Sequence, residues 1–311
     1  MAFNAQNFVT EKTREIKSQV GNDTALCATS GGVDSMVCAF LAHRALGRNL
    51  IAVFIDDGLM REGEPKKVTS LLRSRGIRTV LVRASNGFFR ALKGKEDPED
   101  MRKAFRDTFY ETLGKAVRKY GAKYLIQGTI AADVIETKGK IKSQHNVLAQ
   151  IGINPRRYGL NVIEPLATLF KPDVRKVGKA LRLPSTIHQR MPFPGPGLAT
   201  RVVGEVTPAK VRLLRKATSI VEREMRNIKA FQTFAVLLDD RATGVRKGKR
   251  SFGNIIVVRS VQSKNAMTAS PTRVPYAVLE RIQKKITSQI PAVTKVLYDI
   301  SPKPPSTIEY I

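Results

Sequence analysis

The sequence has 311 residues, of which 42% are hydrophobic and 26% charged, so a disordered, collagenous or low-complexity chain is excluded. The length favours two domains. The chain carries 54 Lys and Arg against 26 Asp and Glu, a net charge of +28, which suits polyanionic partners but is equally the mark of a basic proteome.

Short apolar runs alternate with longer helix-like segments in the first half of the chain. We predict helices at 35–47, 64–75 and about 98–120, and the strands lie at 24–29, 50–55, 79–83 and 123–127. This alternation is typical of a parallel sheet with helices on both faces. A loop rich in Lys and Gly is expected at 137–146.

Three prolines and two glycines in residues 191–197 predict a linker. We therefore expect one domain at 1–200 and a second at 201–311. Beyond the linker we predict helices at 208–227 and 275–290, and strands near 202–206, 231–238, 254–261, 294–300 and 307–310. This order predicts a smaller α+β domain.

No apolar run reaches the 18 or so residues of a membrane span, and no signal peptide is predicted at the start. The only cysteines, Cys27 and Cys38, form neither a disulfide framework nor a CxxC metal pattern. We expect a cytoplasmic protein without a structural metal or a membrane partner.

A glycine-rich hexapeptide follows the first predicted strand and opens the first predicted helix: Ser30, Gly31, Gly32, Val33, Asp34 and Ser35. Glycines let several backbone N–H groups meet one small anion at a helix N-terminus, so the pattern predicts a phosphate site. A carboxylate beside a phosphate needs a cation between them, and Asp34 therefore indicates Mg²⁺. A plain turn with a serine cap is the alternative.

The hexapeptide SGGVDS resembles the pyrophosphate-binding loop of N-type ATP pyrophosphatases, which cleave ATP between its α and β phosphates and adenylate a substrate. Further segments resemble, in order, the synthetase part of GMP synthetases: 54–61, 127–129, 142–146, 164–166, 192–198 and 299–309. The resemblance implies an α/β fold of the adenine nucleotide alpha hydrolase type, with a parallel five-stranded sheet. It also implies a C-terminal domain for dimerisation and XMP binding.

The resemblance assigns ATP, with Mg²⁺ at Asp34, to the loop made of Ser30, Gly31, Gly32, Val33, Asp34, Ser35 and Met36. It assigns catalytic roles to Asp34 and to residues of a mobile lid over ATP, namely Asp133, Glu136, Lys142 and His145. The family usually has two adjacent histidines in the lid, whereas this chain has Gln144 before His145. His43 and His188 are expected to be structural or surface residues.

The resemblance assigns XMP binding to five further residues, namely Arg250, Lys303, Thr307, Ile308 and Glu309. Lys303 and Arg250 offer positive charges to the nucleotide phosphate, and Glu309 offers an acceptor to purine N–H groups. The family tends to end in Trp and an acidic residue, where this chain has Tyr310 and Ile311.

The implied reaction makes GMP from XMP, ATP and ammonia through an adenyl-XMP intermediate. No amidotransferase segment is present in the sequence, so the resemblance implies a separate glutaminase subunit as partner, and a homodimer. Nucleic acid is not expected as a partner. Two alternatives stay open: a tRNA-modifying ATP pyrophosphatase, encouraged by the charge, and a catalytically degraded nucleic-acid-binding protein.

Overall fold

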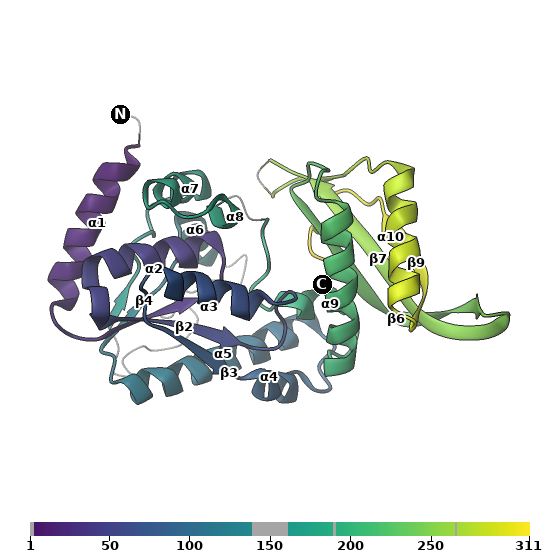
Figure 1. Cartoon of the computed structure of the whole chain (residues 1–311), viewed down its shortest axis with the longest axis horizontal. Coiled ribbons are helices and arrows are strands. Elements are labelled where there is room, and N and C mark those ends of the chain that lie inside the picture. Colours follow the sequence, from purple (N-terminus) through teal and green to yellow (C-terminus); the bar gives the residue numbers. More distant parts are fainter. Residues whose placement is uncertain (1–2, 139–160, 189–190, 265) are drawn as a thin grey trace. The chain divides into compact units, whose positions relative to one another are not determined.

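The computed structural model describes residues 3–138, 161–188, 191–264 and 266–311 (Figure 1). It forms two compact units. The N-terminal unit comprises 1–57, 63–84 and 106–190, and the C-terminal unit comprises 58–62, 85–105 and 191–311. The predicted division at residue 200 stays a proposal, because two earlier segments of the chain also belong to the C-terminal unit.

The N-terminal unit is built on a five-stranded parallel sheet in the order β3-β2-β1-β4-β5. The two central strands β1 and β2 are almost continuously apolar and buried, as strands covered on both faces must be. The strands are β1 (Ala25–Thr29), β2 (Leu50–Asp56), β3 (Thr79–Arg83), β4 (Tyr124–Ile126) and β5 (Asn161–Ile163). The predicted fold class is confirmed.

Helices follow the strands on both faces of this sheet. Right-handed crossovers from β1 to β2 and on to β3 place their two helices on one face, and the return to β4 places the next helix on the other (Figure 1). The helices described up to residue 188 are α1 (Ala5–Val20), α2 (Val33–Leu46), η1 (Gly47–Asn49), α3 (Glu64–Ser74), α4 (Ser85–Leu92), α5 (Pro98–Tyr120), α6 (Ala131–Lys138), α7 (Lys171–Ala180) and α8 (Ser185–His188), of which α4 and the start of α5 belong to the C-terminal unit. Helix α2 packs against α1 and α7.

The C-terminal unit contains a second sheet, in which β7 pairs with β6 and β8 antiparallel and with β9 parallel. Figure 1 shows α9 and α10 packed together along this sheet. The elements are η3 (Gly197–Arg201), α9 (Pro208–Glu224), β6 (Gln232–Arg246), β7 (Lys249–Gln262), β8 (Ser270–Pro271), α10 (Tyr276–Gln289) and β9 (Val293–Asp299).

Two predicted strands of this unit are wrong. At 202–206 only Val202 bridges to β6, and the chain then turns at Gly204, whose φ is +75°. At 307–310 the carbonyl groups of Thr307 and Ile308 accept hydrogen bonds from the Arg259 side chain rather than from a neighbouring strand. A side chain thus satisfies the backbone that a ladder would otherwise satisfy.

The segments 58–62 and 85–105 belong to the C-terminal unit through specific contacts. Arg215 of α9 donates hydrogen bonds to the carbonyl groups of Gly58 and Met60. The Leu198 N–H donates to the Leu59 carbonyl at 2.8 Å.

Within the described residues, no helix is long and apolar enough to cross a membrane.

Candidate active site

The loop between β1 and α2 is closed by its own serines. The Ser35 hydroxyl accepts from the Ser30 N–H at 3.1 Å and donates to the Gly32 carbonyl at 3.1 Å. The Ser30 hydroxyl lies 3.2 Å from it and accepts from the Gly32 N–H. Gly31 has φ +78°, a conformation in which a side chain would be strained. The glycines and serines therefore fix a tight loop, as the sequence predicts.

The loop presents the N-terminus of α2 to a ligand. The first backbone bond into this helix runs from the Met36 N–H to the Gly32 carbonyl. The N–H groups of Val33, Asp34 and Ser35 donate to no acceptor within the described part of the chain. These donors and the positive end of the helix dipole make an anion site.

The same loop lies where the strand order reverses. The chain leaves β1 toward β2 and leaves β4 toward β5, so the loops after these neighbouring strands diverge, and open α/β sheets bind ligands at such a point. The loop after β4 comes very close to the first turn of α2. A Cβ added to Gly128 would stand 2.9 Å from the Asp34 carbonyl and from the Ser35 nitrogen.

Asp34, in the first turn of α2, has one carboxylate oxygen bound and one without a partner. Its Oδ2 accepts from Lys171 Nζ of α7 at 2.7 Å, and the Asp34 side chain is 22% exposed. Its Oδ1 is buried and has no hydrogen-bond partner in the described structure. A buried carboxylate oxygen without a partner costs free energy unless a ligand satisfies it.

The open oxygen fits a magnesium ion. Mg²⁺ in nucleotide sites keeps several waters and phosphate oxygens and takes only one or two protein carboxylates. In keeping with this, no cluster of three or more His, Cys, Asp or Glu side chains suited to a metal occurs in the described parts of the chain. Asp34 is thus a suitable single protein ligand for a metal that arrives with ATP.

A second acidic group lies beyond the loop after β4. The Thr129 hydroxyl donates to Glu164 Oε1 at 2.5 Å. Burial raises the pKa of Glu164 above its ordinary value, the Thr129 hydrogen bond opposes this, and the charge of Asp133 adds to the rise. Asp133 Oδ2 in turn accepts from the Ile130 N–H at 2.9 Å.

Most predicted lid residues cannot be placed. Lys142 and His145 lie outside the described residues, as does Gln144. Glu136 belongs to α6, but its side chain is not described. The predicted loop at 137–146 is therefore untested except that helix α6 extends to residue 138.

The predicted XMP tail is anchored by two buried arginines of the C-terminal unit. Arg201 is fully buried, donates to both oxygens of Glu309 at 3.0 and 3.1 Å, and stacks on the rings of Phe193 and Phe234. Gln232 also donates to Glu309. The Glu309 carboxylate is thus held by a bidentate pair.

Arg259 fixes the backbone of the same tail. It is fully buried, donates to the carbonyl groups of Thr307 and Ile308, and forms an ion pair with Asp299 at 2.5 Å. Burial alone would raise the pKa of Asp299, but hydrogen bonds from Ser301 and the Arg259 charge lower it below its ordinary value. Three of the five predicted XMP residues therefore lie together.

Lys303 lies near the other tail residues, whereas Arg250 of the same chain lies far from them. The Lys303 backbone bridges to Ala269, and its Nζ donates to the Ala266 carbonyl at 2.9 Å. Residues 269–271 lie beside the end of β7 at Gln262, but Arg250 stands at its other end, next to the hairpin turn. Twelve residues of strand separate Arg250 from Gln262, about 40 Å.

Comparison with known proteins decides the family. Residues 4–198 match the family model of NAD synthase, and residues 219–310 match that of the GMP synthase C terminal domain. Proteins named as one subunit of a glutamine-hydrolyzing GMP synthase are similar over nearly their whole length. That of Pyrococcus horikoshii is 50% identical over 97% of this chain and 98% of its own, and that of Archaeoglobus fulgidus 49% over 99% and 100%. The chain belongs to this GMP synthase subunit family.

A third member of the GMP synthase subunit family, from Methanopyrus kandleri, is 46% identical over 99% of each chain. The sequence alone missed three residues that hold these sites, Lys171, Arg201 and Arg259, and gave no role to Thr129 and Glu164, although both lie in segments that resemble the family. One signal was available. Lys171 stands in the first turn of a helix, where the dipole disfavours a cation, so it needs a carboxylate or an anion nearby.

Proposed function

We propose that this protein is the synthetase subunit that makes GMP from XMP, MgATP and ammonia. The xanthine O2 attacks the α-phosphorus of ATP, and pyrophosphate leaves. Ammonia then adds at C2 of the adenyl-XMP intermediate, and AMP leaves with the former O2, which gives GMP after loss of a proton. The observation that carries the proposal is the SGGVDS anion site at the switch point of a chain that belongs to the GMP synthase subunit family.

The protein's part in such a reaction is positioning and charge neutralisation. The N–H groups of Val33, Asp34 and Ser35 bind the leaving pyrophosphate, and the Ser30 and Ser35 hydroxyls shape the loop around it. Asp34 would hold Mg²⁺ with the oxygen that has no protein partner, and the metal would offset negative charge on the phosphates. Lys171 keeps the other oxygen of Asp34 in place.

We assign the remaining predicted catalytic residues as proposals too. Asp133 and Glu136 lie on α6, beyond the loop after β4. Lys142 and His145 follow within 139–160, and we propose that they neutralise phosphate charge and transfer protons, respectively. Gln144 supplies an amide where the family usually has a histidine.

XMP binding is proposed at the tail, with the two chains of a homodimer sharing the site. Lys303, Thr307, Ile308 and Glu309 bind the nucleotide in one chain, supported by Arg201 and Arg259. Arg250 lies too far along β7 to reach the same phosphate in its own chain. We therefore propose that the β6–β7 hairpin of the partner chain supplies it.

The name of the relatives supports a separate glutaminase that delivers ammonia. We further propose a cytoplasmic location, since ATP and purine nucleotides are the substrates.

The net charge of +28 favours one competing function, modification of tRNA. An assay separates the two. The protein is incubated with MgATP and ammonium and either XMP or bulk tRNA, and AMP and GMP are quantified by liquid chromatography. We expect AMP and GMP in equal amounts with XMP, and no AMP with tRNA. AMP formation that depends on tRNA and not on XMP would contradict the proposal.

A further inference from the structure

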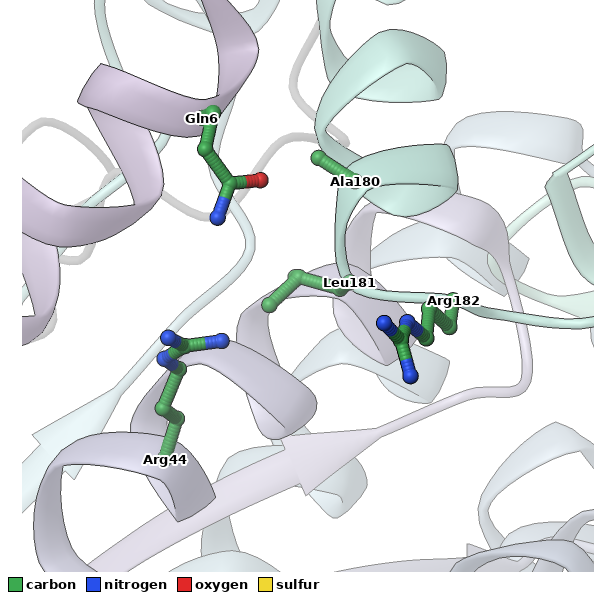
Figure 2. A pocket seen from close by; sticks show the side chains of 5 residues that line it. All are labelled: Gln6, Arg44, Ala180, Leu181 and Arg182. Atoms are coloured by element: carbon green, nitrogen blue, oxygen red, sulfur yellow. The ribbon is translucent and has the colours of Figure 1, made fainter.

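The N-terminal unit contains a cavity of about 450 Å³ that the proposed reaction does not use. It is lined by Gln6 of α1, Arg44 of α2, and Ala180, Leu181 and Arg182 at the end of α7. Figure 2 shows Arg44 and Arg182 on either side of the Leu181 side chain, with the Gln6 amide on the side of Arg44.

The cavity is positively charged and uncompensated. None of its five lining residues is acidic. Both arginines are exposed, and within the described residues no carboxylate pairs with the guanidinium of Arg44 or of Arg182. A helix C-terminus favours a cation, which accounts for Arg44 in the last turn of α2. Arg182 follows the C-cap of α7, so the same dipole effect favours its positive charge.

Arg182 has a backbone conformation that arginine rarely adopts. Its φ is +58°, in the left-handed region that ends many helices and usually holds glycine. The Arg182 N–H bonds to the Lys179 carbonyl and the Leu183 N–H to the Gly178 carbonyl, so the chain is fixed there. An exposed side chain kept at a strained position points to a use for that side chain.

The cavity is separate from the nucleotide loop. Helices α2 and α7 pack together, with Asp34 and Lys171 joined at their N-terminal ends. Arg44 and Arg182 lie at the C-terminal ends of the same two helices. Ten residues of helix separate Asp34 from Arg44, which is about 15 Å.

We propose that this cavity binds a small phosphorylated metabolite, with the phosphate between Arg44 and Arg182. Guanidinium groups match phosphate oxygens with paired hydrogen bonds, and the Gln6 amide adds a further donor. The volume is that of a small-molecule site rather than of a single bound ion. This site goes beyond the proposed function.

The test uses a reporter beside the cavity. Thr10, exposed on α1 one turn after Gln6, is replaced by Cys and labelled with an environment-sensitive fluorophore; Cys27 and Cys38 are buried. Inorganic phosphate and ribose 5-phosphate are the probes. We expect a saturable fluorescence change, with binding of both probes weakened about tenfold or more by Arg44→Gln or Arg182→Gln. The matched control Arg48→Gln, in η1 outside the cavity, should change binding less than twofold.

Two further variants make the outcome decisive. Arg182→Gly suits the left-handed backbone, so it should unfold at an equal or higher temperature and still lose binding. Asp34→Asn should bind the probes like the unmutated protein, which separates this site from the proposed reaction. A change that does not saturate, or equal weakening by Arg48→Gln and Arg182→Gln, would overturn the proposal.

Discussion

Gly31 and Gly128 shape the candidate active site in different ways. Gly31 supplies a positive φ that closes the loop, and Gly128 leaves room for the first turn of α2. The first role could be predicted from the sequence, because the hexapeptide shows it. The second could not, because it depends on the loop after β4 meeting the backbone of α2, about 90 residues away in the sequence.

The loop carboxylate gives the first prediction. Asp34→Asn keeps the size of the side chain but removes the charge that faces the metal, so we expect AMP formation to fall on the order of a hundredfold or more while the protein stays folded. Circular dichroism and an AMP assay measure the two effects. Asp173→Asn, which only breaks a surface pair with Lys176, is the control and should stay active. Unchanged AMP formation by Asp34→Asn would refute the assignment.

Gly128 gives the second prediction. In Gly128→Ala the new methyl group meets backbone at 2.9 Å, so we expect a loss of about 1 to 3 kcal/mol in unfolding free energy and weaker ATP binding. Urea unfolding and ATP titration measure both. The control is Gly87→Ala in α4, where no atom lies within 4 Å and an increase of about 0.5 to 1 kcal/mol is expected. Equal stabilisation by both substitutions would show that the close approach is absent.

Asp299 gives a pH-dependent prediction. Its pKa in the folded protein is lowered, so its charge stabilises the fold above the unfolded pKa of about 3.9, and this contribution is lost as pH falls through the folded pKa. Asp299→Asn leaves Arg259 buried without a charged partner and should lower the unfolding free energy by about 3 kcal/mol at pH 7. The difference from the unmutated protein should shrink below pH 4. If the unfolding free energies of Asp299→Asn and the unmutated protein differ by the same amount at every pH, the Arg259–Asp299 ion pair is not the source of the difference.

Some elements were predicted within a few residues, and others were missed. The apolar runs of β1 and β2 and the proline starts of α5 and α9 gave their positions within a few residues. Strand β5 was missed: it has three residues, of which Asn161 is exposed and only Ile163 is buried, so it shows no apolar run. Helix α7 was missed because its interior is polar, although Pro172 and Asp173 mark its start. The extension of β6 and β7 beyond their buried parts was also missed, because exposed strand residues follow no apolar alternation.

The hairpin of β6 and β7 gives the prediction at this scale. Lys247 and Gly248 both have positive φ, which closes a tight turn between β6 and β7. Arg250 therefore lies at the end of β7 that is next to this turn. Arg250→Ala and Lys303→Ala should each weaken XMP binding about tenfold to a hundredfold. If the partner chain supplies Arg250, mixing the two weakly binding variants under conditions of subunit exchange should restore full XMP affinity at up to one site in two. No recovery in dimers shown to be mixed would place both residues in one chain's site.

At the scale of the whole molecule, the sequence resemblance predicted the family, the fold class and the anion loop, and the comparisons and the structure confirm the first two. It did not predict that Glu309 is paired with a buried arginine, because Arg201 is 108 residues away in the chain. Ammonium should support GMP formation by this chain, and glutamine alone should not until a glutaminase is added. Product formation from glutamine alone would contradict the two-subunit account.

The central claim is that XMP is adenylated on O2, and an isotope measurement tests it directly. XMP labelled with ¹⁸O at O2 is converted with MgATP and ammonium, and the AMP and pyrophosphate are analysed by mass spectrometry. Since O2 bonds to the α-phosphorus and leaves with AMP, the account predicts one ¹⁸O in each AMP and none in pyrophosphate. Unlabelled AMP formed together with GMP would contradict it.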